Sequence, residues 1–303
     1  MTRHLLSIAD LSSDELSSVL EIAQRPSQPV LAGLGVALLF EHPSARTRNA
    51  TEMAVVQLSG HPVSIRGDEV GIDTRESAED VARTLACYHA LIAARVRSHS
   101  TLKRMADALD LAGLPVPVVN LLSDHEHPTQ AIADLLTLRD CVGELEGATL
   151  AYVGDGNNVC RSLLGAASLA GVKVRVSSPA GYAPSKDDLA WAAELGGDVS
   201  VHPDPRDAVV GADAVYTDVW SSMGQDSERA SRLEAFAGFA LDKTLLEAAP
   251  AHTVVMHCLP AHRGEEIEAA VVDGPRSVVW QQARNRLHAA RAVLWFLRAE
   301  AVA

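Results

Sequence analysis

The stretch VALLFEHPSARTR, residues 36–48, decides how the first part of the chain folds. Its first five residues form a short apolar run that predicts a buried strand, and helical spacing follows over residues 49–58. Residues 41–48 stand directly after that strand and directly before that helix. A helix N-terminus offers unpaired N–H groups and the positive end of the helix dipole. This strand-to-helix junction therefore predicts an anion site.

The side chains of this junction agree with an anion ligand such as phosphate. Ser44 and Thr47 carry hydroxyl groups that can donate, while Arg46 and Arg48 carry planar guanidinium groups that grip phosphate oxygens. The alternative is an ordinary N-cap followed by two solvated arginines, and the spacing alone does not separate the two interpretations.

Short β-branched runs alternate with amphipathic helical patterns along almost the whole chain, which is typical of parallel α/β architecture. The predicted strands are residues 36–40, 62–66, 90–96, 116–122, 149–153, 172–177, 199–202, 214–218 and 253–258. We therefore expect an α/β fold of two parallel-sheet domains joined by helices. The expected boundaries are 1–142 for the first domain and 143–279 for the second, with the helix 280–303 packing back on the first.

Composition restricts the classes of protein and of partner. The chain of 303 residues is long enough for two cores, and its net charge of −13 argues against a nucleic-acid partner. No apolar run is long enough to predict a membrane helix, and the acidic residues near the start do not suit a signal peptide. Four cysteines without CxxC spacing favour a reducing compartment. We therefore expect a cytoplasmic protein.

A second junction, His127-Pro128-Thr129-Gln130, has the same strand-to-helix character. His127 could donate a hydrogen bond to a developing oxyanion, and Gln130 could bind an amide-like NH₂ group. A His–Pro pair is also a common helix start, so this motif does not identify a site by itself.

The turn Gly154-Asp155-Gly156-Asn157-Asn158 follows a predicted strand and opens a helix, as a dinucleotide-binding turn would. The third glycine of that fingerprint is missing, and Ser177-Ser178-Pro179 stands where the ribose-binding acidic residue would be expected. These two absences argue against a dehydrogenase.

Two further strand ends carry candidate side chains. Asp218 begins DVWSSMG, residues 218–224, where a carboxylate can hold an ammonium group and Gly224 allows the loop to move. The long stretch 220–240 has little strand signal and is a candidate mobile loop. Cys258, in His257-Cys258-Leu259-Pro260, could be a nucleophile or a buried inert thiol, and adjacent positions in a strand point His257 away from it.

Taken together and in this order, the motifs resemble the aspartate/ornithine carbamoyltransferase family over nearly the whole chain. The phosphate loop of that family, Ser-Thr-Arg-Thr-Arg, corresponds here to residues 44–48, and His-Pro-x-Gln corresponds to residues 127–130. Asp-x-x-x-Ser-Met-Gly at 218–224 and His-Cys-Leu-Pro at 257–260 are typical of the ornithine branch. Asn-Arg-Leu-His at 285–288 matches the C-terminal motif.

The resemblance implies transfer of the carbamoyl group from carbamoyl phosphate to the side-chain amine of L-ornithine, giving L-citrulline and phosphate, with no metal and no cofactor. The implied catalytic residues are Arg95, His127, Asp218 and Cys258. Those implied to bind carbamoyl phosphate are Ser44, Ala45, Arg46, Thr47, Arg95, His127, Gln130, Cys258, Leu259 and Arg286. Those implied to bind ornithine are Asn158, Asp218, Ser222 and Met223. A related enzyme acting on putrescine, lysine or a modified ornithine is the alternative.

The chain departs from the family pattern at two places. Ala45 replaces a threonine of the phosphate loop and removes one hydroxyl group, although its backbone N–H remains. In the segment 66–77 a neighbouring subunit normally lends a polar or basic side chain, and here Glu69 or Arg75 could occupy that place. Such lending requires an oligomer, and the resemblance implies a homotrimer or a multiple of trimers.

Overall fold

A computed structural model describes residues 2–221 and 228–301. These residues form two compact units, of which unit 1 comprises residues 1–133 and 286–303 and unit 2 comprises residues 134–285. Both junctions lie within helices, α6 (Pro128–Val142) and α13 (Val279–Glu300). Unit 1 is therefore built from two separate stretches of the chain. Residue 142, where the sequence placed a domain boundary, is the last residue of α6.

Unit 1 contains a four-stranded sheet, in the order β2-β1-β3-β4, whose described strand pairs are all parallel. Its strands are β1 (Gly35–Phe40), β2 (His61–Arg66), β3 (Leu91–Arg95) and β4 (Val118–Leu122). The N-terminal segment lies along β4, because Leu5 forms a bridge with Val119. This pairing covers the β4 edge of the sheet.

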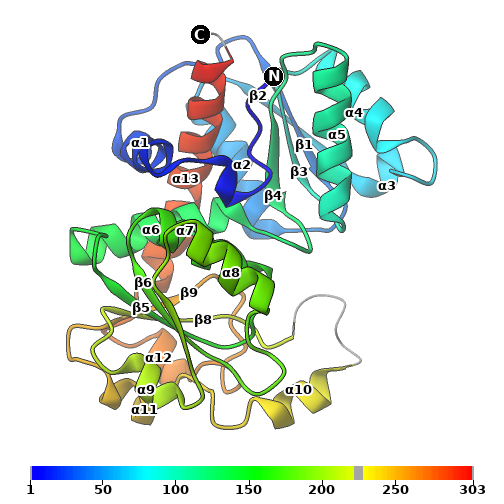
Figure 1. The fold of residues 1–303 in the computed structure, drawn as a ribbon. Helices are drawn as coiled ribbons and strands as arrows, with labels where there is room; N and C mark the ends of the chain where they lie inside the picture. The colour runs from blue at the N-terminus through cyan, green and yellow to red at the C-terminus, as the bar shows by residue number, and fades with distance from the viewer. Residues whose placement is uncertain (1, 222–227, 302–303) are drawn as a thin grey trace. The chain divides into compact units, whose positions relative to one another are not determined.

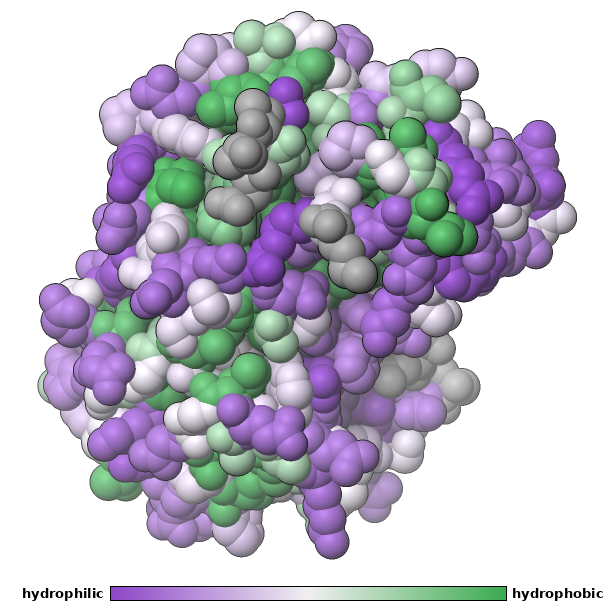
Figure 2. Space-filling view, turned by 45° about the horizontal axis from the view of Figure 1, so that its top comes forward, coloured by the Kyte–Doolittle hydropathy of each residue, from purple (hydrophilic) through white to green (hydrophobic). Residues whose placement is uncertain are grey.

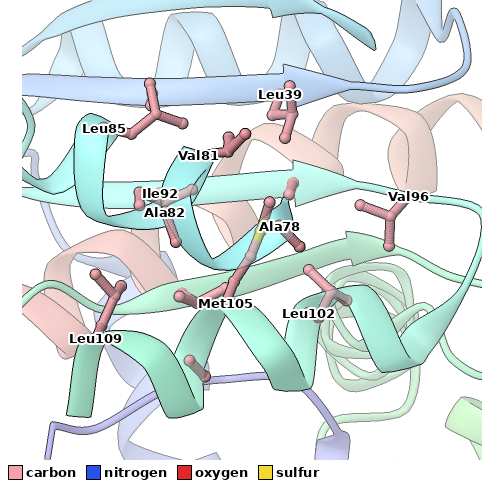
Figure 3. Close-up of a cluster of buried hydrophobic side chains, with 14 of the residues drawn as sticks. Leu39, Ala78, Val81, Ala82, Leu85, Ile92, Val96, Leu102, Met105 and Leu109 are labelled. Atoms are coloured by element: carbon pink, nitrogen blue, oxygen red, sulfur yellow. The ribbon is translucent and has the colours of Figure 1, made fainter. Parts of the chain in front are cut away.

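Helices cover both faces of this sheet (Figure 1). In chain order the helices that lie wholly in unit 1 are η1 (Ile8–Asp10), α1 (Ser13–Gln24), α2 (Ala45–Gln57), α3 (Gly67–Val70), α4 (Ala78–Ala86) and α5 (His99–Leu111), and residues 286–300 of α13 also belong to this unit. Figure 3 shows Leu39 and Ile92 of the sheet facing Val81 of α4 and Met105 of α5, all of them buried. Alternate residues of β1 point to opposite faces, so Leu38 faces the opposite layer.

Unit 2 contains a five-stranded parallel sheet, in the order β7-β6-β5-β8-β9 among the described residues. Its strands are β5 (Thr149–Val153), β6 (Lys173–Ser177), β7 (Val199–His202), β8 (Ala214–Thr217) and β9 (Val254–His257). The central strand β5 is buried along its whole length, which explains its continuous apolar sequence.

The helices of unit 2 form layers on the two faces of its sheet (Figure 1). They are α7 (Asn158–Leu169), α8 (Lys186–Glu194), α9 (Pro205–Val209), α10 (Arg229–Ala235), α11 (Lys243–Ala248) and α12 (Ala269–Val272). Residues of α9, α11 and α12 share one buried core with Val153, Val215 and Val255 of the sheet. The α/β fold with two parallel sheets that the sequence predicts is therefore confirmed.

Two helices interrupt segments that the sequence left without regular structure. The helix α3 lies in the segment 66–77, and α10 lies in the stretch 220–240 that was predicted to be a loop. That part of the loop prediction is wrong, because Arg232 of α10 is buried and makes ionic contacts that hold the helix in place. Residues 222–227 of the same stretch lie outside the described residues.

The face of the molecule seen in Figure 2 is mostly hydrophilic. Polar and charged side chains cover much of it, and the hydrophobic residues on it lie in separate small groups.

Within residues 2–221 and 228–301, no helix combines the length and the hydrophobicity that crossing a membrane requires.

Candidate active site

Each sheet has one point at which the order of its strands reverses. In unit 1 the chain proceeds from β1 outward to β2 and from β3 outward to β4, so the reversal lies between β1 and β3. In unit 2 it lies between β5 and β8. Ligands of parallel α/β sheets bind beyond the carboxyl ends of the strands at such points. Ligand-binding residues are therefore expected in the loops after β1, β3, β5 and β8.

The loop after β1 ends in a capped helix. Ser44 is the N-cap of α2, and its hydroxyl oxygen accepts a hydrogen bond from the backbone N–H of Thr47 at 3.3 Å. Arg48 is engaged with Glu52, one turn along the helix, at 2.8 Å. The side chain of Arg46 is exposed, and its guanidinium has no hydrogen bond or ion pair with any described residue. The first turn of α2 thus presents one uncommitted cation.

Arg95 is the last residue of β3 and is only 6% exposed. Its Nε atom has no hydrogen-bond partner among the described residues, and none of their carboxylates lies in ion-pair contact with it. Burial, together with the nearby charges of Arg286 and Arg46, lowers the pKa of Arg95 to about 10. A buried cation without a counter-ion is costly, and a bound anion would remove that cost.

His127 and Arg286 complete this group. Arg286 donates to the side-chain oxygen of Gln130 and, at 3.1 Å, to the hydroxyl oxygen of Thr47. His127 is buried, and desolvation, followed by the charges of Arg286 and Arg95, holds its pKa well below the usual value. The imidazole is therefore neutral near pH 7 and can donate one N–H without adding charge. In unit 1 the structure thus places the predicted site residues Arg95, His127 and Arg286 close to one another.

Glu126, directly before His127, is a positioning residue that the sequence interpretation missed. Its side chain is 1% exposed and accepts hydrogen bonds from the Ser7 hydroxyl at 2.6 Å and from the Ile8 backbone N–H at 2.9 Å. The N-terminal segment and the loop that carries His127 are thereby tied together. The one sequence signal for this role was the acidic residue Glu126 itself, directly before His127.

The segment 66–77, in which a residue lent to a neighbour was expected, forms contacts within its own chain. The Glu69 carboxylate lies 3.1 Å from the guanidinium of Arg66, and Arg75 donates to the Glu69 carbonyl oxygen at 3.2 Å. Asp73 accepts two hydrogen bonds from Arg104 of α5. The segment is therefore anchored at Asp73, while the exposed Arg75 side chain is held by a backbone carbonyl.

In unit 2, Asp218 is the centre of a second group. It follows β8, is 4% exposed and accepts from the Asn157 side-chain amide at 2.9 Å and from the Val219 backbone N–H at 2.8 Å. The Cys258 thiol donates to the same carboxylate at 2.9 Å. Asn157 is also the N-cap of α7, accepting from two backbone N–H groups. The sequence interpretation named Asn158 and did not name Asn157, whose contact with Asp218 the structure adds.

Cys258 is half-buried, and desolvation together with the Asp218 charge raises the pKa of its thiol well above the usual value. The thiol therefore stays protonated and is a poor nucleophile. His257 does not act on it, because the His257 ring contacts Glu266 at 3.1 Å and accepts from the Leu259 backbone N–H at 2.9 Å. Leu259 itself has a positive φ of 61°.

The remaining predicted residues lie at helix N-termini or outside the described residues. Ala45 and Asn158 are the first residues of α2 and α7. Ser222 and Met223 lie outside the described residues. The donor atoms of Asp218, His257 and Cys258 are close enough to hold a metal ion, but both ring nitrogens of His257 are already engaged. The group formed by Asp218, His257 and Cys258 is therefore unsuited to a metal ion.

Family models match the chain in two consecutive segments. Residues 3–140 match the carbamoyl-P binding domain, and residues 146–297 match the Asp/Orn binding domain, of aspartate/ornithine carbamoyltransferase. The chain belongs to the aspartate/ornithine carbamoyltransferase family. The resemblance drawn from the sequence motifs is thus confirmed.

Individual members of this family are similar over nearly their full length. The ornithine carbamoyltransferase of Parafrankia sp. is 47% identical, with 99% of this chain and 98% of the relative covered. That of Acidothermus cellulolyticus is 48% identical, with 98% and 97% covered. The crystal structure of the Thermus thermophilus ornithine carbamoyltransferase has a TM-score of 0.88 and 44% identity, covering 98% of this chain and 99% of that one. The Pyrococcus furiosus enzyme gives 0.90 and 41%, with 96% of each chain covered.

Proposed function

We propose that this chain transfers the carbamoyl group of carbamoyl phosphate to the side-chain amine of L-ornithine, giving L-citrulline and phosphate. The observation that carries the proposal is the buried Arg95, which has no counter-ion among the described residues and lies in the field of Arg46 and Arg286. Such a group suits a small, highly charged anion. The ornithine carbamoyltransferases named above support the choice of acceptor.

The donor is assigned to the first domain, residues 1–142 together with the helix 280–303. The α2 N-terminus, with Ser44, Ala45, Arg46 and Thr47, holds the phosphate through backbone and side-chain donors. Arg95, His127 and Arg286 polarise the carbonyl oxygen of the carbamoyl group, and Gln130 orients its nitrogen. The neutral His127 suits this task, because it donates a hydrogen bond to the oxygen as negative charge develops there.

The acceptor is assigned to the second domain, residues 143–279. Asp218 and Asn158 hold the amino acid together with Ser222 and Met223, and Cys258 and Leu259 contact the reacting groups. Cys258 positions the amine and does not form a covalent intermediate, since its raised pKa keeps the thiol protonated.

The reaction needs a neutral amine. Its lone pair attacks the carbonyl carbon and forms a C–N bond, and the tetrahedral intermediate then breaks the C–O bond to phosphate, which leaves with the electron pair. The nitrogen loses one proton, which passes to the departing phosphate or to solvent. Catalysis comes from proximity and from stabilising charge on the carbonyl oxygen and the departing phosphate.

We also propose a cytoplasmic homotrimer, or a multiple of trimers, in which the segment 66–77 lends a side chain to a neighbouring subunit. Arg75 suits that place better than Glu69, because a carboxylate would repel phosphate and Glu69 already pairs with Arg66. Sedimentation of the purified protein tests the assembly. One chain has a mass of 32.1 kDa, so the proposal predicts a mass of three chains or a multiple of that. A monomer that turns over at full rate would contradict it.

An amine panel tests the acceptor. The protein is assayed with carbamoyl phosphate and L-ornithine, putrescine, L-lysine or N-acetylornithine, and the carbamoylated product is measured. We expect kcat/KM for L-ornithine to exceed that for every other amine at least about tenfold, because a lost or misplaced polar contact costs about 1.4 kcal/mol or more. A preference for another amine would favour the alternative acceptor, and no turnover with any of them would reject the function.

A further inference from the structure

The segment that follows His-Cys-Leu-Pro carries a group of donor atoms that the proposed reaction does not use. Suitable ligand atoms of His262, Glu265 and Glu266 all lie within 4.8 Å of one another. His262 Nδ1 is 3.7 Å from a Glu265 carboxylate oxygen, Oε2, and 3.9 Å from Glu266 Oε2. All three residues belong to unit 2.

Glu266 provides an observation that distinguishes this group from an ordinary acidic surface cluster. The residue is 0% exposed, and its Oε2 atom has no hydrogen-bond partner among the described residues. Its other oxygen, Oε1, accepts from the His257 ring at 3.1 Å and from the His262 backbone N–H. No Lys or Arg of the described chain pairs with this carboxylate. A buried oxygen of this kind leaves about 1–3 kcal/mol of desolvation uncompensated.

We propose that His262, Glu265 and Glu266 bind a divalent transition-metal ion, with Zn²⁺ as the best fit. One imidazole nitrogen and two carboxylate oxygens form a donor set that suits Zn²⁺, and a solvent molecule completes four-coordination. The ion would neutralise the two carboxylates and occupy the free side of Glu266 Oε2. Mg²⁺ and Ca²⁺, which prefer oxygen ligands, suit the imidazole poorly.

Two of the three distances between donor atoms need only a small adjustment, and the third, between Glu265 and Glu266, is within 4.8 Å. Donor atoms about 2.1 Å from a tetrahedral Zn²⁺ lie about 3.4 Å apart. The separations of 3.7 and 3.9 Å therefore close by a few tenths of an ångström. His262 and Glu265 are 36% and 26% exposed in their side chains, so both can rotate and the ion can enter from solvent. Arg229 pairs with the other oxygen of Glu265, Oε1, and leaves Oε2 available.

The site is linked to the residues proposed to contact substrate. Glu266 holds the His257 ring, and that ring accepts from the backbone N–H of Leu259. A metal ion on Glu266 therefore acts on the same carboxylate that orients His257. The ion is proposed as a structural or regulatory ligand, separate from the group transfer.

Calorimetric titration of the chelator-treated protein with Zn²⁺ tests the site. We expect one strong site per chain, and we expect Zn²⁺ to raise the Tm because it binds the folded state alone. His262→Gln and Glu265→Gln should each lower the affinity by about 10–100-fold or more, because each removes a ligand. Both residues are partly exposed, so these variants should fold. Glu266→Gln is avoided, since it alters a fully buried contact.

Two controls make the result decisive. Asp273→Asn removes an exposed carboxylate that pairs with Arg263 nearby, and it should leave Zn²⁺ affinity unchanged. Cys258→Ser disrupts the other possible metal group, Asp218-His257-Cys258, and should also leave it unchanged. Three results would each overturn the proposal. These are unaltered Zn²⁺ binding in both the His262 and Glu265 variants, loss of Zn²⁺ binding in Cys258→Ser, and the absence of a strong Zn²⁺ site in the parent protein.

Discussion

At the scale of single residues, the first turn of α2 separates two arginines that look equivalent in the sequence. Arg48 is paired with Glu52, whereas the Arg46 guanidinium has no hydrogen bond or ion pair with any described residue and contributes to the positive field at Arg95. Because no hydrogen bond or ion pair to a described residue is lost, removal of the Arg46 side chain should cost little stability. Arg46 and Arg48 therefore form a natural test pair.

We predict that Arg46→Ala abolishes useful turnover and leaves the Tm unchanged. The lost charge-assisted contact with phosphate should cost about 2–5 kcal/mol of binding or transition-state stabilisation. Arg48→Ala is the matched control and should change kcat/KM far less. Carbamoyl phosphate affinity is measured by calorimetry and turnover by steady-state rates. A folded Arg46→Ala protein with parental affinity would reject the phosphate assignment.

Asp218 supports a second residue-level prediction. Asp218→Asn should raise KM for ornithine or lower kcat markedly, because the carboxylate that faces the cationic amino acid is gone. Affinity for carbamoyl phosphate should change little. Asn157→Ala should act in the same direction but less strongly, since Asn157 acts on the substrate through Asp218, whose carboxylate it holds by a 2.9 Å hydrogen bond. Equal loss of both substrates in Asp218→Asn would contradict the assignment of the two ligands to different domains.

At the scale of elements, α10 is fixed by a buried ion pair. Arg232 lies 2.8 Å from Asp155 and donates to the Trp220 carbonyl oxygen at 2.9 Å, and burial raises the pKa of the Asp155 carboxyl. Among the described residues of unit 2, this seven-residue helix has few other contacts as strong as the buried Arg232–Asp155 ion pair. The contact therefore connects α10 to the turn after β5.

We predict that Arg232→Leu lowers the free energy of unfolding by about 3 kcal/mol, because it leaves the Asp155 carboxylate buried and unpaired. Adding Asp155→Asn should recover much of that loss. Arg229→Leu, on the same helix but half-exposed, is the control and should cost less than about 1 kcal/mol. Denaturant unfolding measures all of these variants. If the Arg232→Leu variant were as stable as the parental protein, the ion pair would have no role in stability.

The two sheets and the helix α10 differ in how far the sequence alone predicts them. Strands such as Val199–His202 could be predicted, because a short β-branched run bounded by turn residues favours a strand over a helix. The helix α10 could not, since its stability comes from Asp155, which lies 77 residues away. The motif loops were predictable because parallel sheets place them at strand ends. Glu126 was not, because its role depends on the docked N-terminal segment.

At the scale of the whole molecule, buried histidines make stability depend on pH. His99 is 9% exposed, and its ring lies 2.9 Å from the Ser123 hydroxyl and packs against the His125 ring with 5.3 Å between centroids. Burial lowers its pKa to about 4, and the nearby charges of His125 and Lys103 act in the same direction, while Asp124 and Asp10 oppose them. As the pH falls, the folded state therefore binds this proton later than the unfolded chain does.

We predict that the His99 contribution to the free energy of unfolding is constant above about pH 6.5 and falls as the pH decreases toward about 4. In that range the unfolded chain has protonated residue 99 and the folded chain has not, so each pH unit costs about 1.4 kcal/mol. Buried His127 adds to the same trend. His99→Gln should flatten the slope, while His252→Gln, at an exposed position, should not. Denaturant unfolding at several pH values measures the slope, and an unchanged slope in His99→Gln would contradict the prediction.

The insertion of unit 2 into unit 1 has a consequence for how the protein is made on the ribosome. Arg286 bonds to Thr47, 239 residues earlier in the chain, and it belongs to α13, which is synthesised after every other described helix. Domains usually fold in the order in which they emerge. Here the continuous unit 2 can fold while unit 1 still lacks residues 286–303. We therefore expect that a nascent chain holds no complete anion site until Arg286 has emerged, and that unit 1 is completed only after unit 2.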